Sequence, residues 1–187
     1  MKAAEISSIV VAGAGIMGTS LAQIFAQHGL RVTLWNRSQE GIDRARTLIT
    51  NSQTALVSAG RLAETESQEL TRRITVETNE SCFADAVFII ESIVENLEAK
   101  QAFFRRINPV VREDCIIATN TSGLSISALG TSVNKPERFV GMHWINPPHL
   151  IPLVEVVSGK ETTVETAGFA YDLALRLGKR PIQVKDI

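Results

Sequence analysis

A glycine-rich stretch near the N-terminus constrains the fold of this chain more than any other feature. Residues 9–12 form an apolar, β-branched run typical of a buried strand, and the run ends at Gly13-Ala14-Gly15-Ile16-Met17-Gly18. The first glycine of such a pattern permits a tight turn, the second lets the backbone approach a ligand, and the third lets a helix pack closely on its strand. The stretch therefore predicts a strand, a tight turn and a helix at the start of an α/β fold.

The helix that follows this turn favours a phosphate group at its first turn. Apolar residues recur at helical spacing from Met17 to Phe25, and Gly29 stands where the helix is expected to end. The first N–H groups of a helix have no partner within it, and together with the helix dipole they attract anions. Residues 13–18 are thus predicted to bind a dinucleotide, and a purely structural strand-to-helix turn is the alternative.

Length and composition narrow the class of protein. The 187 residues suit one large domain, and a hydrophobic content of 44% is enough for a packed core. A net charge of -1 gives no reason to expect nucleic acid or an anionic membrane as partner. We find no signal-peptide pattern and no apolar run of membrane-spanning length. Cys82 and Cys115 are expected to be buried free thiols, so the sequence favours a cytoplasmic protein.

The rest of the chain alternates strand patterns with helix patterns. Strands are expected at residues 31–35, 74–76, 87–90, 115–118, 139–143, 153–157 and 182–184. Helices are expected at residues 38–60, 64–73, 98–107, 125–129 and 162–177. This alternation predicts a Rossmann-type, doubly wound, mostly parallel sheet. The consecutive helices 38–60 and 64–73 are expected to form a helical hairpin inserted after the second strand.

The end of the second expected strand leaves the identity of the dinucleotide open. In dinucleotide-binding folds this position usually carries an acid that bonds the adenosine ribose. Asn36 and Arg37 stand there instead. An amide still bonds a ribose hydroxyl without repelling a 2′-phosphate, and an arginine can pair with that phosphate. Both residues are therefore predicted to bind NAD or NADP; alternatively they only turn the chain before a helix capped by Ser38.

Five motifs, in this order and at this spacing, resemble the L-3-hydroxyacyl-CoA dehydrogenase family. They are the glycine stretch at 13–18, Glu95-Asn96, Asn120-Thr121-Ser122, His143-Trp144-Ile145-Asn146-Pro147 and Leu153-Val154-Glu155-Val156. The resemblance covers essentially the whole chain, as the N-terminal NAD-binding domain of that family. It implies an oxidoreductase of fatty acid metabolism and β-oxidation that transfers a hydride between NAD and the 3-hydroxyl of an acyl-CoA, in either direction.

The resemblance also implies a larger protein. Family members continue beyond the position of Ile187 with a Pro-Gly-Phe segment, an active-site asparagine and a helical domain that completes the active site and forms a dimer. Residues 1–187 are thus expected to be the dinucleotide-binding domain. The helical substrate and dimerisation domain is expected after residue 187, outside this chain, and the full-length protein is expected to be a homodimer.

Oxidation of a secondary alcohol needs a base for the hydroxyl proton and a hydride acceptor. His143 suits the role of base, and Glu155 lies twelve residues on, across a strand-turn-strand connection that can bring the two side chains together. A carboxylate there orients the imidazole and stabilises its protonated form. The residues alone leave open a core histidine with a solvated glutamate, whereas the resemblance assigns them as a catalytic dyad.

Four further residues are implied by the resemblance. Ser122 follows a strand end and matches a serine that contacts substrate and cofactor, while Asn146 matches an asparagine near the nicotinamide and His143. Glu95 and Lys100 match positions that contact the cofactor. The alternatives are a capping serine, an asparagine that starts a diproline turn, and ordinary helix charges. No spacing of cysteine, histidine and acidic residues suggests a metal site.

The residues leave the substrate class open. Ser52 matches the CoA-contacting serine of the family, but Ala59 and Gly60 stand near the place of its lysine, with Arg61 as the nearest cation. Residues 37–73 contain no lysine, and six arginines nearly balance five acids. Gulonate and carnitine dehydrogenases, which oxidise free hydroxy acids, share the pattern at 146–155. The first hypothesis is therefore a 3-hydroxyacyl-CoA, the second a free 3-hydroxy acid, and the third a non-catalytic dinucleotide-binding module.

Overall fold

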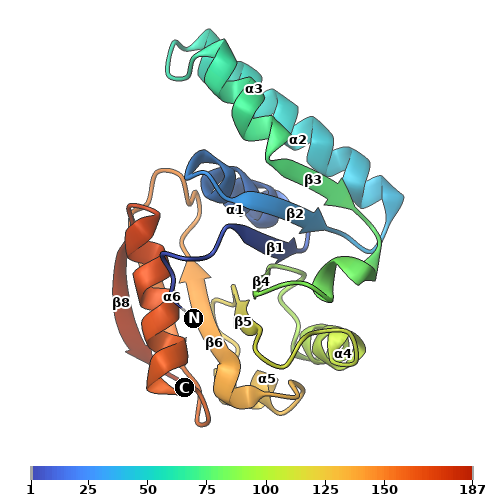
Figure 1. The fold of residues 1–187 in the computed structure, drawn as a ribbon, viewed down its shortest axis with the longest axis vertical. Coiled ribbons are helices and arrows are strands. Elements are labelled where there is room, and N and C mark those ends of the chain that lie inside the picture. Colours follow the sequence, from blue (N-terminus) through green and yellow to red (C-terminus); the bar gives the residue numbers. More distant parts are fainter. Residues whose placement is uncertain (1, 187) are drawn as a thin grey trace.

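Eight strands form one sheet in the order β3-β2-β1-β4-β5-β6-β7-β8 in the computed structural model, which describes residues 2–186 (Figure 1). The strands are β1 Ser8–Ala12, β2 Arg31–Trp35, β3 Ile74–Glu77, β4 Phe88–Glu91, β5 Ile116–Thr119, β6 Phe139–Trp144, β7 Leu153–Ser158 and β8 Arg180–Lys185. Neighbouring strands are parallel except β6 and β7, which are antiparallel. The predicted Rossmann-type, mostly parallel sheet is confirmed.

Six α-helices connect these strands within the described residues. They are α1 Ile16–Gln27, α2 Gln39–Ser58, α3 Glu64–Arg72, α4 Leu97–Ile107, α5 Ile126–Gly130 and α6 Val164–Arg176. Short 3-10 turns lie at Glu80–Phe83 and Pro136–Arg138. Ser38, Asn96 and Thr163 cap α2, α4 and α6 by accepting a hydrogen bond from a first-turn N–H group. The predicted cap at Ser38 is confirmed.

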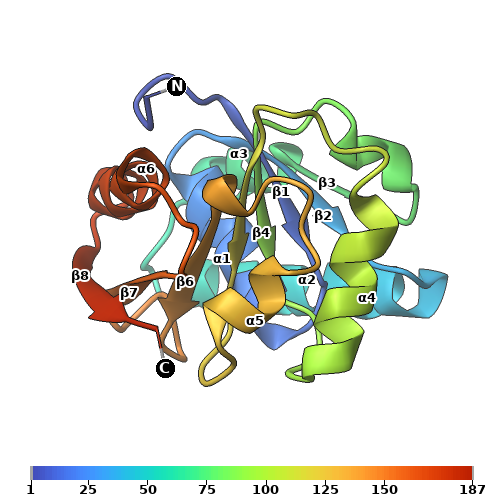
Figure 2. The same cartoon turned by 90° about the horizontal axis from the view of Figure 1, so that it is seen from below.

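Helices cover both faces of the sheet and create two apolar cores. The residues of α1 and α6 pack on one face in a core that includes Phe25, Phe88 and Leu173, and α4 and α5 pack on the other in a core that includes Phe103 and Phe139. Figure 2 shows α4 and α6 well separated, with the central strands between them. Because β4 and β5 are buried on both faces, their sequences are continuous apolar runs rather than alternating ones.

The second and third helices form the predicted hairpin. Figure 1 shows α2 and α3 running side by side and projecting beyond the edge of the sheet, and both helices contact α1. Their inner faces bury Ile49 and Leu70, while most of their other residues are exposed or half-buried. The predicted helical hairpin insertion after the second strand is confirmed.

The last strand differs from the prediction. It was expected at 182–184, but β8 spans Arg180–Lys185 and pairs with β7 along its whole length, from Leu153↔Arg180 to Ser158↔Lys185. The strand pattern is hidden at its ends because Arg180 and Lys185 are exposed at the edge of the sheet, where no burial selects apolar residues.

Both cysteines are at least partly buried. Cys82 and Cys115 are both free thiols, the first half-buried and the second buried, and burial raises the pKa of each to about 12.

Among residues 2–186, no helix has the length and apolar character needed to cross a membrane. The same residues bring together no group of three or more His, Cys, Asp and Glu side chains that could hold a metal ion.

Candidate active site at the carboxyl ends of the strands

The glycine turn lies where the strand order reverses, with β2 on one side of β1 and β4 on the other. Gly13 has a φ of 112°, which favours glycine, and a Cβ there would collide with the carbonyl oxygen of Ser92. A Cβ at Gly18 would collide with the carbonyl oxygen of Gly13. These two glycines are therefore required by the internal packing of the turn, as predicted for a strand followed closely by a helix.

Gly15 differs because nothing inside the protein requires a glycine there. It precedes α1 with an ordinary φ of -78°, and a Cβ built on it would meet no atom within 4 Å. The first turn of α1 has neither a capping side chain nor an acidic residue, whereas α2, α4, α5 and α6 are all capped by side chains. The open space and the unpaired first-turn N–H groups fit the pyrophosphate of a dinucleotide.

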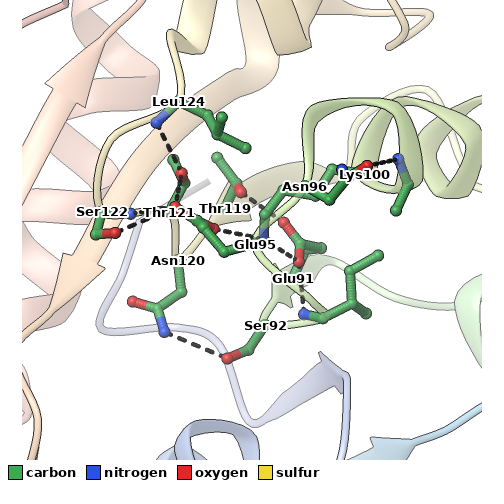
Figure 3. A network of polar contacts seen from close by, with 12 residues as sticks. Glu91, Ser92, Glu95, Asn96, Lys100, Thr119, Asn120, Thr121, Ser122 and Leu124 are labelled. Carbon is green, nitrogen blue, oxygen red and sulfur yellow. Dashed lines mark hydrogen bonds and ion pairs between the residues drawn. The ribbon is translucent and has the colours of Figure 1, made fainter.

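A buried ion pair lies at the ends of β4 and β5 (Figure 3). Glu91 and Lys100 are both fully buried, with 2.6 Å between Glu91 Oε1 and Lys100 Nζ. The same oxygen accepts from the Ile93 N–H at 2.6 Å, and Oε2 accepts from the Thr119 hydroxyl at 2.5 Å. Burial raises the pKa of the Glu91 carboxyl, and the charge of Lys100 and these hydrogen bonds oppose that rise. With both oxygens accepting, the geometry holds the carboxylate form.

Glu95 connects this pair to the loop after β5. Its Oε2 lies 3.4 Å from Lys100 Nζ, and its Oε1 accepts from the Thr121 hydroxyl at 2.5 Å and the Ser122 N–H at 2.8 Å. The Ser122 hydroxyl lies 3.2 Å from the same oxygen. Partial burial tends to raise the pKa of Glu95, but the bonds from Thr121 and Ser122 and the charge of Lys100 outweigh it, so the pKa is lowered. A carboxylate thus lies beside the exposed Ser122 at neutral pH (Figure 3).

Asn120 ties three strand ends together. Its side-chain oxygen accepts from the Trp144 N–H at 2.8 Å, and its side-chain nitrogen donates to the Ser92 hydroxyl at 3.2 Å. Ser92 in turn follows β4 and donates its N–H to the Ala12 carbonyl at the end of β1. The loop that carries Ser122 is therefore fixed next to the strand end that carries His143, at the same edge as the glycine turn.

His143 and Glu155 form a pair across β6 and β7. They are directly opposite in the antiparallel register, with 2.9 Å between Nδ1 and Oε2. Their side chains are 20% and 31% exposed, so the pair is open to a small molecule on one side. Because a carboxylate only accepts, the imidazole Nδ1 carries the proton and donates it, which leaves Nε2 as the free nitrogen. This arrangement can accept a proton at Nε2 and stabilise the resulting imidazolium.

Comparison with known protein families identifies the family to which the chain belongs. Residues 8–187 match the family described as 3-hydroxyacyl-CoA dehydrogenase, NAD binding domain. The chain belongs to this family. Since the family is one of NAD-binding domains, the dinucleotide expected at the glycine turn is NAD.

Individual relatives agree with this assignment. A probable 3-hydroxybutyryl-CoA dehydrogenase from Deinococcus radiodurans is 39% identical over 94% of this chain and 63% of its own length. A 5-formyl-3-hydroxy-2-methylpyridine 4-carboxylate 5-dehydrogenase from Mesorhizobium japonicum is 35% identical over 96% of this chain and 58% of its own length. The crystal structure of (S)-3-hydroxybutyryl-CoA dehydrogenase from Ralstonia eutropha has a TM-score of 0.94 at 32% identity, over 98% of this chain and 65% of its own. The chain thus spans less than two thirds of each.

Most of the predicted site residues lie at the carboxyl edge of the sheet. Glu95, Ser122, His143 and Glu155 come from the loops and strands described above, and Asn146 is exposed just after β6, before the cis bond to Pro147. The residues of the glycine turn, 13–18, lie at the same edge. Their contacts with a cofactor or substrate stay predictions.

The structure places Lys100 inside the protein. The sequence predicts that this side chain contacts the cofactor, and in this structure it is fully buried with its ammonium group paired with Glu91 and Glu95. Its contact with the cofactor stays a prediction.

Asn36 and Arg37 also lie at the carboxyl edge, because they follow β2, which is parallel to β1 and ends beside the glycine turn. Ser52 lies on α2 of the helical hairpin. Asn36 follows β2, and its side chain lies against Gly41 at the start of α2, where a Cβ would collide with it. Arg37 is exposed, and Ser52 is half-buried on α2. Their roles toward the adenosine ribose and CoA stay predictions.

Sequence reasoning missed Glu91 and Thr119. Both residues end strands that are buried on both faces, and their side chains bond each other at 2.5 Å. The available signal was an acid at the end of an apolar run, followed nine residues later by a lysine in a helix. An isolated buried charge costs several kcal/mol, so an acid in such a position predicts a cationic partner.

The contrast between Gly15 and Gly18 gives a direct test of the dinucleotide site. We expect Gly15→Ala to weaken NADH binding by about tenfold, equivalent to about 1.4 kcal/mol, because the methyl group enters the space that the pyrophosphate requires. Its free energy of unfolding should change by less than about 1 kcal/mol. The measurements are titration of NADH fluorescence and urea denaturation.

Gly18→Ala is the matched control for this experiment. It should lower the free energy of unfolding, because its methyl group meets the Gly13 carbonyl inside the turn. Unchanged NADH affinity in a folded Gly15→Ala protein would contradict a pyrophosphate at this position.

Proposed function

We propose that this domain belongs to an NAD-dependent enzyme that oxidises the 3-hydroxyl of a 3-hydroxyacyl-CoA of the 3-hydroxybutyryl type, or reduces the corresponding ketone. The observation that carries the proposal is the His143–Glu155 pair, with 2.9 Å between Nδ1 and Oε2, at the sheet edge that also holds the glycine turn. The names of the relatives from Deinococcus radiodurans and Ralstonia eutropha support this substrate class.

The proton transfer follows from the geometry of the pair. His143 Nε2 accepts the proton of the substrate hydroxyl as the carbonyl forms, and the imidazole becomes positively charged. The Glu155 carboxylate, bonded to Nδ1, keeps the ring oriented and stabilises that charge. NAD, when bound, supplies the acceptor for the hydride that leaves the same carbon. In the reverse direction the imidazolium returns its proton to the alkoxide oxygen.

Ser122 and Asn146 are assigned to the substrate side of this site. The exposed Ser122 hydroxyl lies at the strand end and can bond the substrate oxygen, which would hold that oxygen for proton transfer. The Asn146 amide both donates and accepts, so it can bond the nicotinamide carboxamide or the substrate oxygen. Residues 13–18 would hold the pyrophosphate, and Asn36 with Arg37 would meet the adenosine ribose.

A free hydroxy acid or another carboxylate is the second candidate substrate. The Mesorhizobium japonicum relative, at 35% identity, is named for a pyridine carboxylate rather than a CoA ester. On the helical hairpin, three of the six arginines between residues 37 and 73 form ion pairs with nearby acids; these are Arg44, Arg46 and Arg73. Their positive charge is partly neutralised, which weakens attraction for a CoA phosphate near Ser52.

A substrate and cofactor screen of the intact protein tests the proposal. We expect reduction of NAD in the presence of (S)-3-hydroxybutyryl-CoA, with kcat/KM at least about 100-fold above that for free 3-hydroxybutyrate, L-gulonate or L-carnitine, because binding energy from the CoA group contributes to the transition state. NADP in place of NAD tests the role of Arg37. Turnover of free acids only would favour the second candidate. Cofactor binding without any turnover would support a non-catalytic module.

Location and assembly belong to the same proposal. Cys82 and Cys115 are free thiols, which suits the reducing cytoplasm. From the resemblance to the family, we also propose a homodimer formed through a helical domain; this chain spans 63% of the length of the Deinococcus radiodurans protein. Size-exclusion chromatography with light scattering on the intact protein would test the dimer.

A further inference from the structure

We infer that Glu91 is a positioning residue, which fixes the loop carrying Ser122 by holding Lys100 and, through it, Glu95. The inference rests on the proposed function for the role of Ser122. Glu91 is fully buried at the end of β4, so it cannot touch substrate or cofactor itself. Any effect that it has on the site must pass through its neighbours, which Figure 3 shows in one continuous network.

The burial of this ion pair is not explained by stability alone. Removing two charges from water costs several kcal/mol per ion, and apolar residues of similar volume often serve stability as well or better. Apolar residues in place of the pair would match their surroundings, because β4 and β5 are otherwise apolar up to Glu91 and Thr119. A buried pair of this kind can instead serve the geometry that it imposes on its neighbours.

Lys100 lies between two carboxylates that compete for it. Its ammonium nitrogen is 2.6 Å from Glu91 Oε1 and 3.4 Å from Glu95 Oε2, so Glu91 holds the shorter contact. If the charge of Glu91 is removed, the ammonium is attracted by Glu95 alone. Glu95 is then drawn toward Lys100 and away from the loop after β5.

That displacement would reach Ser122 directly. Glu95 Oε1 accepts from the Ser122 N–H at 2.8 Å and the Thr121 hydroxyl at 2.5 Å, and the Ser122 hydroxyl lies 3.2 Å from it. One oxygen thus fixes both the backbone and the side chain of Ser122. Because Ser122 is exposed, no packing replaces these bonds when the oxygen moves.

Hydrogen exchange on the intact protein without ligand tests the positioning role independently of activity. We expect Glu91→Gln, which keeps the shape of the side chain, to speed exchange of the Ser122 amide by about tenfold. The Leu173 amide, in the core of α6, exchanges through global unfolding, so any change there measures the loss of stability, and the Ser122 amide should exchange faster than the Leu173 amide in the variant. Glu98→Gln, on the exposed side of α4, is the matched control and should alter neither amide. Unchanged exchange at Ser122 in folded Glu91→Gln would overturn the inference.

A double-mutant cycle then tests whether the effect on turnover passes through Ser122. We expect Glu91→Gln to lower kcat/KM by about 10-fold, since small misplacements of a bound substrate cost up to about 100-fold. The double variant with Ser122→Ala should be no slower than Ser122→Ala alone. Fully additive losses in kcat/KM would overturn the inference, because they would mean that Glu91 affects turnover by a route that does not involve Ser122.

The two experiments separate the inference from the proposed function. If no hydroxy substrate is turned over, the proposed function fails, but the exchange rate of the Ser122 amide still decides the role of Glu91. If Glu91→Gln does not fold, Glu91→Asp serves instead, because it keeps the charge but draws the carboxylate back from the Lys100 ammonium, so that Glu95 holds the closer contact. It should also speed exchange at Ser122, and no change there would overturn the inference.

Discussion

Replacement of His143 by alanine is expected to lower kcat by about 100-fold to 10,000-fold in the intact protein, the range for loss of a positioned general base. The affinity for NADH should change little, and the free energy of unfolding should fall by no more than about 1.5–3 kcal/mol, because the side chain makes one hydrogen bond to a charged group, Glu155. Steady-state kinetics with the substrate identified in the screen measures kcat, NADH titration measures the affinity, and urea denaturation measures the free energy of unfolding.

Two further variants test the same role of His143. Glu155→Gln keeps a side-chain oxygen near Nδ1 but removes the charge, so we expect a smaller loss in kcat than for His143→Ala. His149→Ala, in the exposed loop between β6 and β7, is the matched control and should be as active as the wild type. A His143→Ala protein that retains its kcat would show that another group accepts the proton.

Replacement of Lys100 by methionine is expected to lower the free energy of unfolding by about 3–5 kcal/mol, because it leaves the buried carboxylate of Glu91 without its counter-charge. Methionine matches the length of lysine, so the loss should come from charge rather than from a cavity. Urea denaturation followed by circular dichroism measures it.

The controls for Lys100 test the origin of that loss. Lys160→Met, at an exposed position, should change the free energy of unfolding by less than about 0.5 kcal/mol. The double variant Glu91→Gln with Lys100→Met should recover much of the loss, because no charge then remains buried without a partner. A Lys100→Met protein as stable as the wild type would mean that Glu91 becomes protonated at no measurable cost.

The order of the elements could be predicted because it depends on local patterns. The continuous apolar runs at β4 and β5 are needed wherever a strand is covered on both faces, and Gly29, Gly60 and Gly178 have the positive φ that ends a helix. The strand β8 was predicted too short, since its polar ends lie at an exposed edge. The short strand-turn-strand connection at 145–152 allows β6 and β7 to pair, but only the structure gives the antiparallel register that sets His143 opposite Glu155.

In the candidate site, too, some contacts could be predicted from the sequence and others could not. His143 and Glu155 could be paired from the sequence because a short strand-turn-strand connection limits how far apart they can be, and the structure gives 2.9 Å between Nδ1 and Oε2. The contact of Lys100 with the cofactor could not be judged, since burial depends on the packing of α4 against the sheet. The same packing brought Glu91 into contact with Lys100, a pair that sequence reasoning did not consider.

The sequence by itself determined that this chain turns from a strand into a helix through three glycines, and that a histidine and an acid lie near a later strand end. These properties follow from backbone freedom and from short connections, both of which are local. Only the tertiary structure identified the carbonyl oxygens of Ser92 and Gly13 as the atoms that exclude a side chain at Gly13 and Gly18. Only it showed that Glu91, Lys100 and Glu95 form one network that reaches Ser122, because such contacts join residues from separate elements whose distances are fixed by the packing of the whole sheet.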